Sequence, residues 1–173
     1  DDRVCGGAFA FGYVHHFVEA ARGKPESVAR LAEFYRTASP NMATFVSNHD
    51  IFAGQRLWDQ VEGDANAYRL AAAGYLLQPG TPFIYYGEEI GQAGAIGLGL
   101  TDDMPNHAPM SWTAVNVGSG GFTTGTPFRP VSPNAALNNV AAQRAEPNSL
   151  LQFYKQMIAL RNTRPSIARG SFE

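Results

Sequence analysis

The stretch TPFIYYG, residues 81–87, is apolar or aromatic at almost every position and follows a Pro79-Gly80 break. A strand with one wet face alternates between apolar and polar residues, whereas a nearly continuous apolar run is typical of a strand covered on both faces. Such strands belong to the parallel sheets of α/β proteins. We therefore predict a buried parallel strand here, and we expect the preceding segments to supply the elements that pair with it and cover it.

The chain before residue 81 alternates between strand and helix signals. Residues 8–13 and 42–47 are short and apolar, and they are bounded by turn-forming residues, so we predict a strand in each. Between them, Pro25 suits a first helical turn, and apolar side chains recur with helical spacing up to a stop near Ser39-Pro40. The apolar positions of this predicted helix are Val28, Leu31, Ala32 and Tyr35. Asp64 is a candidate cap for a second, Ala- and Leu-rich helix that stops at Pro79-Gly80.

The alternation of strand and helix signals stops after the third predicted strand. Residues 88 to about 147 are rich in Gly, Pro, Asn and Thr, and aromatic anchors within them favour an ordered excursion over a linker. The clearest helix follows, capped by Asn148 or Ser149. One face of this helix is predicted to carry Leu150, Tyr154, Met157 and Ile158.

Repeated βα units predict an α/β fold with a parallel sheet and right-handed crossovers. Three units cannot close a barrel, so the alternatives are a small open α/β sheet or the last three βα units of a partial (β/α)8 TIM barrel. In both architectures the functional residues lie at the carboxyl ends of the strands. The chain begins without Met, and we expect it to be part of a longer protein.

The composition limits the function classes. The 173 residues are 45% hydrophobic and 16% charged with a net charge of −2, and there is no Lys/Arg cluster, so no nucleic-acid partner is expected. No apolar run is long enough to span a membrane. The single cysteine, Cys5, excludes an internal disulfide and leaves a secreted, periplasmic or cytoplasmic location open. The small charged share favours a neutral partner such as a sugar over a polyanion.

The polar triplet Asn48-His49-Asp50 ends the second predicted strand and is the leading candidate site. On its residues alone it is also typical of a local turn, because Asn and Asp favour Asx-turns. Three neighbouring side chains offer too few convergent ligands for a metal ion. The Glu88-Glu89 pair follows the third strand, but adjacent side chains point to opposite faces, so we expect local hydrogen bonding rather than an acid/base dyad.

Other signals are weaker. His15 and His16 are expected at the surface or hydrogen-bonded in the core, and Cys5 is expected to be an inert thiol. The Gly-rich residues 91–100 lack dinucleotide-binding spacing, Ser111 and Ser119 lack a nucleophile elbow, and no cofactor motif is evident. Trp112 and Phe122 lie in a polar, Gly-rich segment, so they are candidates for a wall on which a sugar stacks rather than for core filling.

Two motifs together resemble the α-amylase family, glycoside hydrolase family 13. FVSNHD (45–50) is similar to the end of the seventh barrel strand in that family, and GTPFIYYGEEIG (80–91) is similar to the eighth. The resemblance extends through PMSW (109–112) to the last helix and so covers nearly the whole chain. It implies the C-terminal portion of a catalytic barrel over residues 1–173, with the segment of about 88–147 as a long loop on the active-site side.

The resemblance also implies roles for individual residues. Asp50 matches the carboxylate that stabilises the transition state, His49 matches a histidine that binds the same sugar, and Asn48 shapes the strand end. The implied partner is an α-glucan oligosaccharide or polysaccharide, cleaved with retention of configuration. A calcium site in the longer parent stays open, because it would depend on loops outside this chain.

The chain also departs from the family pattern. The nucleophile and general-acid motifs of the fourth and fifth strands do not occur in these residues, and the retaining reaction needs both carboxylates. We therefore expect the isolated chain to be inactive. A non-catalytic accessory protein built on the same barrel is the alternative. A slice of a barrel is also expected to expose Phe11, Phe45 and Phe83, and either to self-associate or to lie beside the remainder of the barrel.

Overall fold

The computed structural model describes residues 7–114, 119–170 and 172. Its three-stranded parallel sheet has the order β1 (Ala8–Phe9), β2 (Met42–Thr44) and β3 (Thr81–Pro82). Ala43 of the central strand pairs with Phe9 on one side and Thr81 on the other. One further hydrogen bond continues each ladder, since the Ala10 amide donates to Ala43 at 2.9 Å and the Phe83 amide donates to Thr44 at 2.8 Å.

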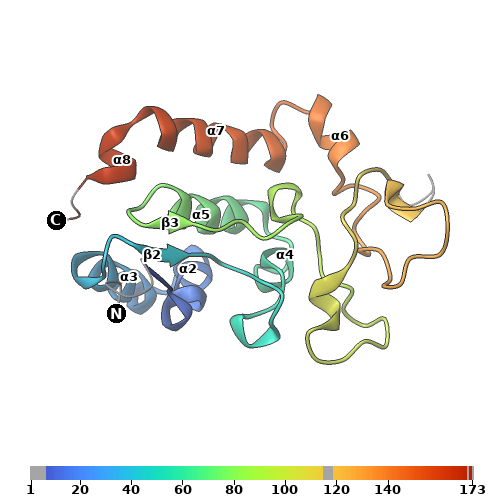
Figure 1. Ribbon diagram of the computed structural model, residues 1–173, viewed down its shortest axis with the longest axis horizontal. Helices are drawn as coiled ribbons and strands as arrows, with labels where there is room; N and C mark the ends of the chain where they lie inside the picture. Colours follow the sequence, from blue (N-terminus) through green and yellow to red (C-terminus); the bar gives the residue numbers. More distant parts are fainter. Residues whose placement is uncertain (1–6, 115–118, 171, 173) are drawn as a thin grey trace.

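Helices separate the strands and form a layer beside the sheet (Figure 1). The α-helices are α2 (Val14–Ala21), α3 (Pro25–Thr37), α4 (Leu57–Gln60), α5 (Ala65–Leu76), α6 (Val140–Ala145), α7 (Leu150–Thr163) and α8 (Pro165–Arg169). Short 3-10 helices are η1 (Phe11–Tyr13), η2 (Ile51–Ala53), η3 (Glu88–Ile90), η4 (Met104–His107) and η5 (Ser119–Gly121). None of the helices in the described part of the chain is long and apolar enough to cross a membrane.

The helix boundaries follow from capping chemistry. The Asp64 carboxylate accepts from the amides of Asn66 and Ala67 and starts α5, and the Ser149 hydroxyl accepts from the Gln152 amide and starts α7. Asp64 was the predicted cap of the first of these helices, and Ser149 was one of the two predicted caps of the second. Pro165 cannot continue α7, which ends at Thr163, and instead occupies the first turn of α8.

The predicted strands are too long, and the helices α2, α4 and α6 were not predicted. The expected strand over 8–13 ends at Phe9, and η1 and α2 follow directly. Alternating aromatic residues suggested a strand, but Val14, Phe17 and Val18 recur with helical spacing and are all buried on α2. The other two strands also stop earlier than predicted, β2 at Thr44 rather than at 47 and β3 at Pro82 rather than at 87.

The core lies between the sheet and the layer formed by α2, α5 and α7. Phe17 of α2, Tyr75 of α5 and Tyr154 of α7 are each at most 2% exposed, and Val46 meets them from the sheet side. The buried faces of two helices differ from the prediction. Val28 of α3 is exposed and Phe34 is the buried residue, while Ile158 of α7 is 37% exposed.

The opposite face of the sheet carries a cluster of aromatic rings. Phe9 contacts Phe83 at 4.8 Å between ring centroids, and both side chains are nearly half exposed. The prediction that the third strand is buried on both faces is therefore wrong for this chain, because no described segment covers this side. The prediction that Phe45 is exposed is also wrong: it is 3% exposed, since Phe9 and Phe11 pack edge-on against it.

Side-chain hydrogen bonds to backbone carbonyls fix the long segment after β3. Asn138 donates to the carbonyls of Ile90 and Gly91 at 3.0 and 2.9 Å, and Gln143 donates to Ile90 at 2.7 Å. Gln92 donates in turn to Ala108 and Pro109. These bonds satisfy buried carbonyls in a segment with little regular structure, as buried backbone requires.

Candidate functional site

A tight turn carries the polar triplet at the end of the second strand. The Asn48 side-chain oxygen accepts from the Asp50 amide at 2.8 Å, which is an Asx-turn. His49 Nε2 lies 3.3 Å from an Asp50 carboxylate oxygen, and the two side chains are 64% and 31% exposed. The local turn and the candidate site are therefore the same feature: the turn uses Asn48 and leaves the other two side chains accessible to a ligand.

An open cavity of about 250 Å³ lies at the carboxyl ends of the three strands. Aromatic side chains supply most of its lining, and the turn supplies its polar edge. The lining residues are Phe9, Phe11, Phe45, Ser47, Asn48, His49, Asp50, Phe83, Ile84 and Tyr85. An apolar wall with a few polar groups at one edge suits a small ligand that has both apolar faces and hydroxyl groups.

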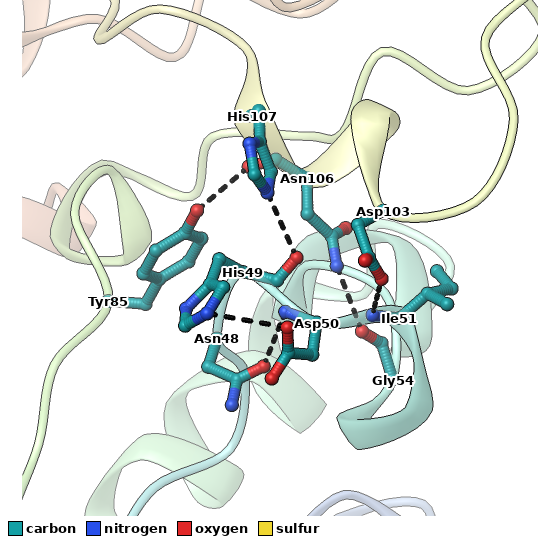
Figure 2. Close-up of polar contacts among 9 residues, drawn as sticks. All are labelled: Asn48, His49, Asp50, Ile51, Gly54, Tyr85, Asp103, Asn106 and His107. Atoms are coloured by element: carbon teal, nitrogen blue, oxygen red, sulfur yellow. Dashed lines mark hydrogen bonds and ion pairs between the residues drawn. The ribbon is translucent and has the colours of Figure 1, made fainter.

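The η4 segment braces the turn from the opposite side, as Figure 2 shows. The Asp103 carboxylate accepts from the Ile51 amide at 2.5 Å, and His107 Nε2 donates to the His49 carbonyl at 3.1 Å. The Asn106 side chain donates to the Gly54 carbonyl at 3.2 Å. Three contacts from residues 50 or more positions away therefore fix the backbone that presents His49 and Asp50.

The guanidinium of Arg56 joins this brace to the third strand. Its side chain is 2% exposed and donates to the Tyr86 carbonyl at 2.7 Å and twice to the Asn106 carbonyl. It also lies over the rings of Tyr85 and Tyr86, 4.7 and 4.5 Å from their centroids. The Tyr85 hydroxyl donates to the same Asn106 carbonyl at 3.1 Å. Arg56 thus holds the cavity-lining Tyr85 against the brace.

Glu88 lies behind the cavity, inside the helix layer. Its carboxylate accepts from the hydroxyls of Tyr75 at 2.5 Å, Tyr154 at 2.7 Å and Ser47 at 3.0 Å, and the side chain is 2% exposed. Burial raises the pKa of Glu88 to about 7, while the three hydroxyl donors oppose that shift. The expected local role of Glu88 agrees with this geometry. Burial also raises the pKa of Glu89.

The remaining predicted site residues lie elsewhere. Trp112 and Phe122 are about half exposed but do not line the cavity. The Trp112 amide instead donates to the Gly120 carbonyl at 2.8 Å. Cys5 lies outside the described residues. Arg56, Asp103, Asn106 and His107 were not predicted as site residues. The only local signal for the last three is the largely polar stretch 101–107 after a Gly-rich segment.

The fold of this chain matches part of a solved α-amylase structure. The fold superposes on the crystal structure of an alpha-amylase from H. orenii with a TM-score of 0.74 and 29% sequence identity, covering 94% of this chain and 32% of that structure. The three parallel strands are therefore part of the (β/α)8 barrel found in such enzymes. The family model for the alpha amylase catalytic domain matches residues 24–170. The chain belongs to this family.

Two relatives in this family have different named activities. A probable alpha-glucosidase of Rhizobium meliloti is 30% identical over 178 residues, which cover 93% of this chain and 32% of the relative. The trehalose synthase/amylase TreS of Mycobacterium tuberculosis is 38% identical over 127 residues, covering 69% of this chain and 20% of the relative. The chain thus spans about a third or less of the length of these relatives.

Proposed function

We propose that this chain is the C-terminal portion, over residues 1–173, of the catalytic barrel of a retaining glycoside hydrolase that acts on α-glucosidic bonds. Its substrates would be starch or maltooligosaccharides. The observation that carries the proposal is the position of Asp50: its carboxylate reaches the edge of an aromatic cavity at the carboxyl ends of parallel strands, where barrel enzymes bind substrate.

Asp50 would stabilise the transition state rather than attack the sugar. The reacting ring becomes oxocarbenium-like, and hydrogen bonds to its hydroxyls strengthen as positive charge develops. A carboxylate accepts such bonds about twice as strongly as a neutral group. His49 would bind the same sugar from the adjacent position, and Asn48 would hold the turn that presents both side chains.

The nucleophile and the general acid would come from other strands of the barrel. Glu88 is unsuited to either role, because it is enclosed by three hydroxyls inside the helix layer. Two carboxylates must flank the scissile bond about 5–9 Å apart in glycosidases. In the described part of this chain, Asp50 is the carboxylate that lines the cavity.

The segment of about 88–147 would form the active-site loop. Its η4 residues contact the Asn48–Asp50 turn, which supports that role. Trp112 and Phe122 lie outside the cavity. They would therefore contact sugar units further along an α-glucan chain rather than the ring that reacts.

The exposed aromatic face supports a further proposal about the protein partner. Phe9, Phe11 and Phe83 would be covered by the remainder of the barrel, and a second copy of this chain would cover them in its absence. The alternative, a non-catalytic accessory protein, would use the same face to bind the rest of its own barrel. The relatives described above are named as enzymes, which favours the catalytic proposal.

The test of this function is an assay of maltotriose and starch hydrolysis by the purified 173-residue chain, together with the same assay on the protein that carries the whole barrel. The proposal expects no turnover from the chain alone and turnover from the whole barrel. Turnover by the chain alone would show that the missing carboxylates are not needed. An inactive whole barrel would favour the accessory protein.

A further inference from the structure

Three metal-ligating side chains lie together on the first two turns of α2. His15, His16 and Glu19 each offer one ligand atom, and these three atoms lie within 4.8 Å of one another. Helical spacing explains this, because residues three and four positions apart share a face, and Glu19 is in that relation to both histidines. None of the three lines the sugar cavity.

The local geometry already orients two of the three donors. His16 Nδ1 lies 3.6 Å from a Glu19 carboxylate oxygen. The Ser27 hydroxyl, on the neighbouring α3, donates to that carboxylate at 2.5 Å and lies 3.0 Å from His16 Nδ1. The ring centroids of His15 and His16 are 4.0 Å apart. The Ser27 hydroxyl therefore holds Glu19 and His16 close together, but it occupies the same two atoms that an ion would bind.

The cluster is open on one side. His15 is exposed, and the Glu19 side chain is 47% exposed, whereas the His16 side chain is 18% exposed. Solvent can therefore reach the three donors, and a water molecule can complete a four-coordinate shell.

We propose that His15, His16 and Glu19 form a binding site for a divalent transition-metal ion of the Zn²⁺ type. Two imidazoles and one carboxylate are donors that suit Zn²⁺, whereas Ca²⁺ and Mg²⁺ prefer sets made of oxygen alone. To bind Glu19 Oε2 and His16 Nδ1, the ion displaces the hydrogen bonds that the Ser27 hydroxyl makes with these two atoms. The loss of these hydrogen bonds opposes metal binding.

The experiment is a calorimetric titration of the folded chain with ZnCl2. The chain has two other histidines and one cysteine, so the background variant carries Cys5→Ser, His49→Ala and His107→Ala. In this background we expect one equivalent of Zn²⁺, and a Co²⁺ complex with the visible absorbance of a four-coordinate site. Adding His16→Ala or Glu19→Gln should weaken binding about tenfold or more. Circular dichroism checks that each variant is folded.

The variant Ser27→Ala distinguishes two interpretations of these residues, a metal site and a cluster held only by hydrogen bonds. This substitution removes the hydroxyl that competes with the ion, so Zn²⁺ should bind at least as tightly as in the background variant. Loss of binding in Ser27→Ala would overturn the proposal. It is equally overturned if the background variant binds no Zn²⁺ at about 1 mM, the weak end of specific affinity, or if His16→Ala leaves the affinity unchanged. None of these three outcomes bears on the sugar site.

Discussion

The Ser47 hydroxyl donates a 3.0 Å hydrogen bond to the Glu88 carboxylate and so joins the residue before the Asn48–Asp50 turn to the residue that opens η3. Tyr75 of α5 and Tyr154 of α7 donate to the same carboxylate. The strand end that presents Asp50 is therefore tied through one buried carboxyl group to two helices of the outer layer. This connection gives the first two predictions.

Glu88 should make the stability of the chain depend on pH. Its pKa is about 7 in the folded state against 4.5 ordinarily, so the folded chain holds this proton more tightly than the unfolded chain. The free energy of unfolding should therefore fall as pH rises from about 4.5 to 7, by at most about 1.4 kcal/mol per pH unit from this group. Urea unfolding of Glu88→Gln at pH 5, 6 and 7 should show a flatter dependence. A slope equal to that of the unaltered chain would contradict this account.

Removal of one hydroxyl from Glu88 should destabilise the fold. Tyr154→Phe leaves the buried carboxylate with one donor fewer and should cost about 1–3 kcal/mol. Tyr35→Phe is the matched control, because the Tyr35 hydroxyl is buried and has no hydrogen-bond partner among the described residues. That control should change the free energy of unfolding by less than about 0.5 kcal/mol, or should stabilise. Equal losses in the two variants would refute the role given to Tyr154.

Arg56 should be needed for both stability and ligand affinity. Arg56→Lys keeps the charge but cannot make the forked contact with the Asn106 carbonyl or lie as a plane over Tyr85. We expect a loss of about 2–4 kcal/mol in the free energy of unfolding, because buried carbonyls lose their donors. The affinity for maltotriose, measured at a temperature where both chains are folded, should also fall. If the variant were as stable as the unaltered chain and bound maltotriose with the same affinity, the structural role given to Arg56 would be contradicted.

The exposed aromatic face should drive self-association of the isolated chain. Phe9 and Phe83 lie edge-on at 4.8 Å on the uncovered side of the sheet. Light scattering should detect oligomers, and the double substitution Phe9→Ser and Phe83→Ser should shift the population toward the monomer. Leu70→Ser, which alters an exposed residue of α5, serves as the control. A monodisperse monomer of the unaltered chain would show that this face needs no partner.

The sequence predicts the elements whose signals are local. The Asp64 and Ser149 caps lie within a few residues of the helices they start, α5 and α7, and the structure agrees with both caps. Strand lengths were not predictable in this way, because pairing depends on the neighbouring strand. The chain turns into η1 at Phe11, and all three strands end earlier than their apolar residues suggest.

The residues of the candidate site also differ in whether a local sequence signal predicts them. Asn48, His49 and Asp50 are consecutive, so their position at a strand end could be predicted from the sequence. The brace could not, because Asp103 and His107 reach the turn across more than 50 residues of chain. Arg56 was missed for a related reason: its partners are backbone carbonyls and ring faces, which leave no pattern in the sequence.

The most direct test of the proposed sugar site compares maltotriose binding to the unaltered chain and to Asp50→Asn by NMR titration. We predict shifts of the backbone amides of residues 47–50 and 83–85, which line the cavity. We also predict an affinity about tenfold weaker for Asp50→Asn, equivalent to about 1.4 kcal/mol, because a neutral amide replaces the charged acceptor. Shifts confined to other residues, or equal affinities of the two chains, would contradict the assignment of Asp50 to sugar binding.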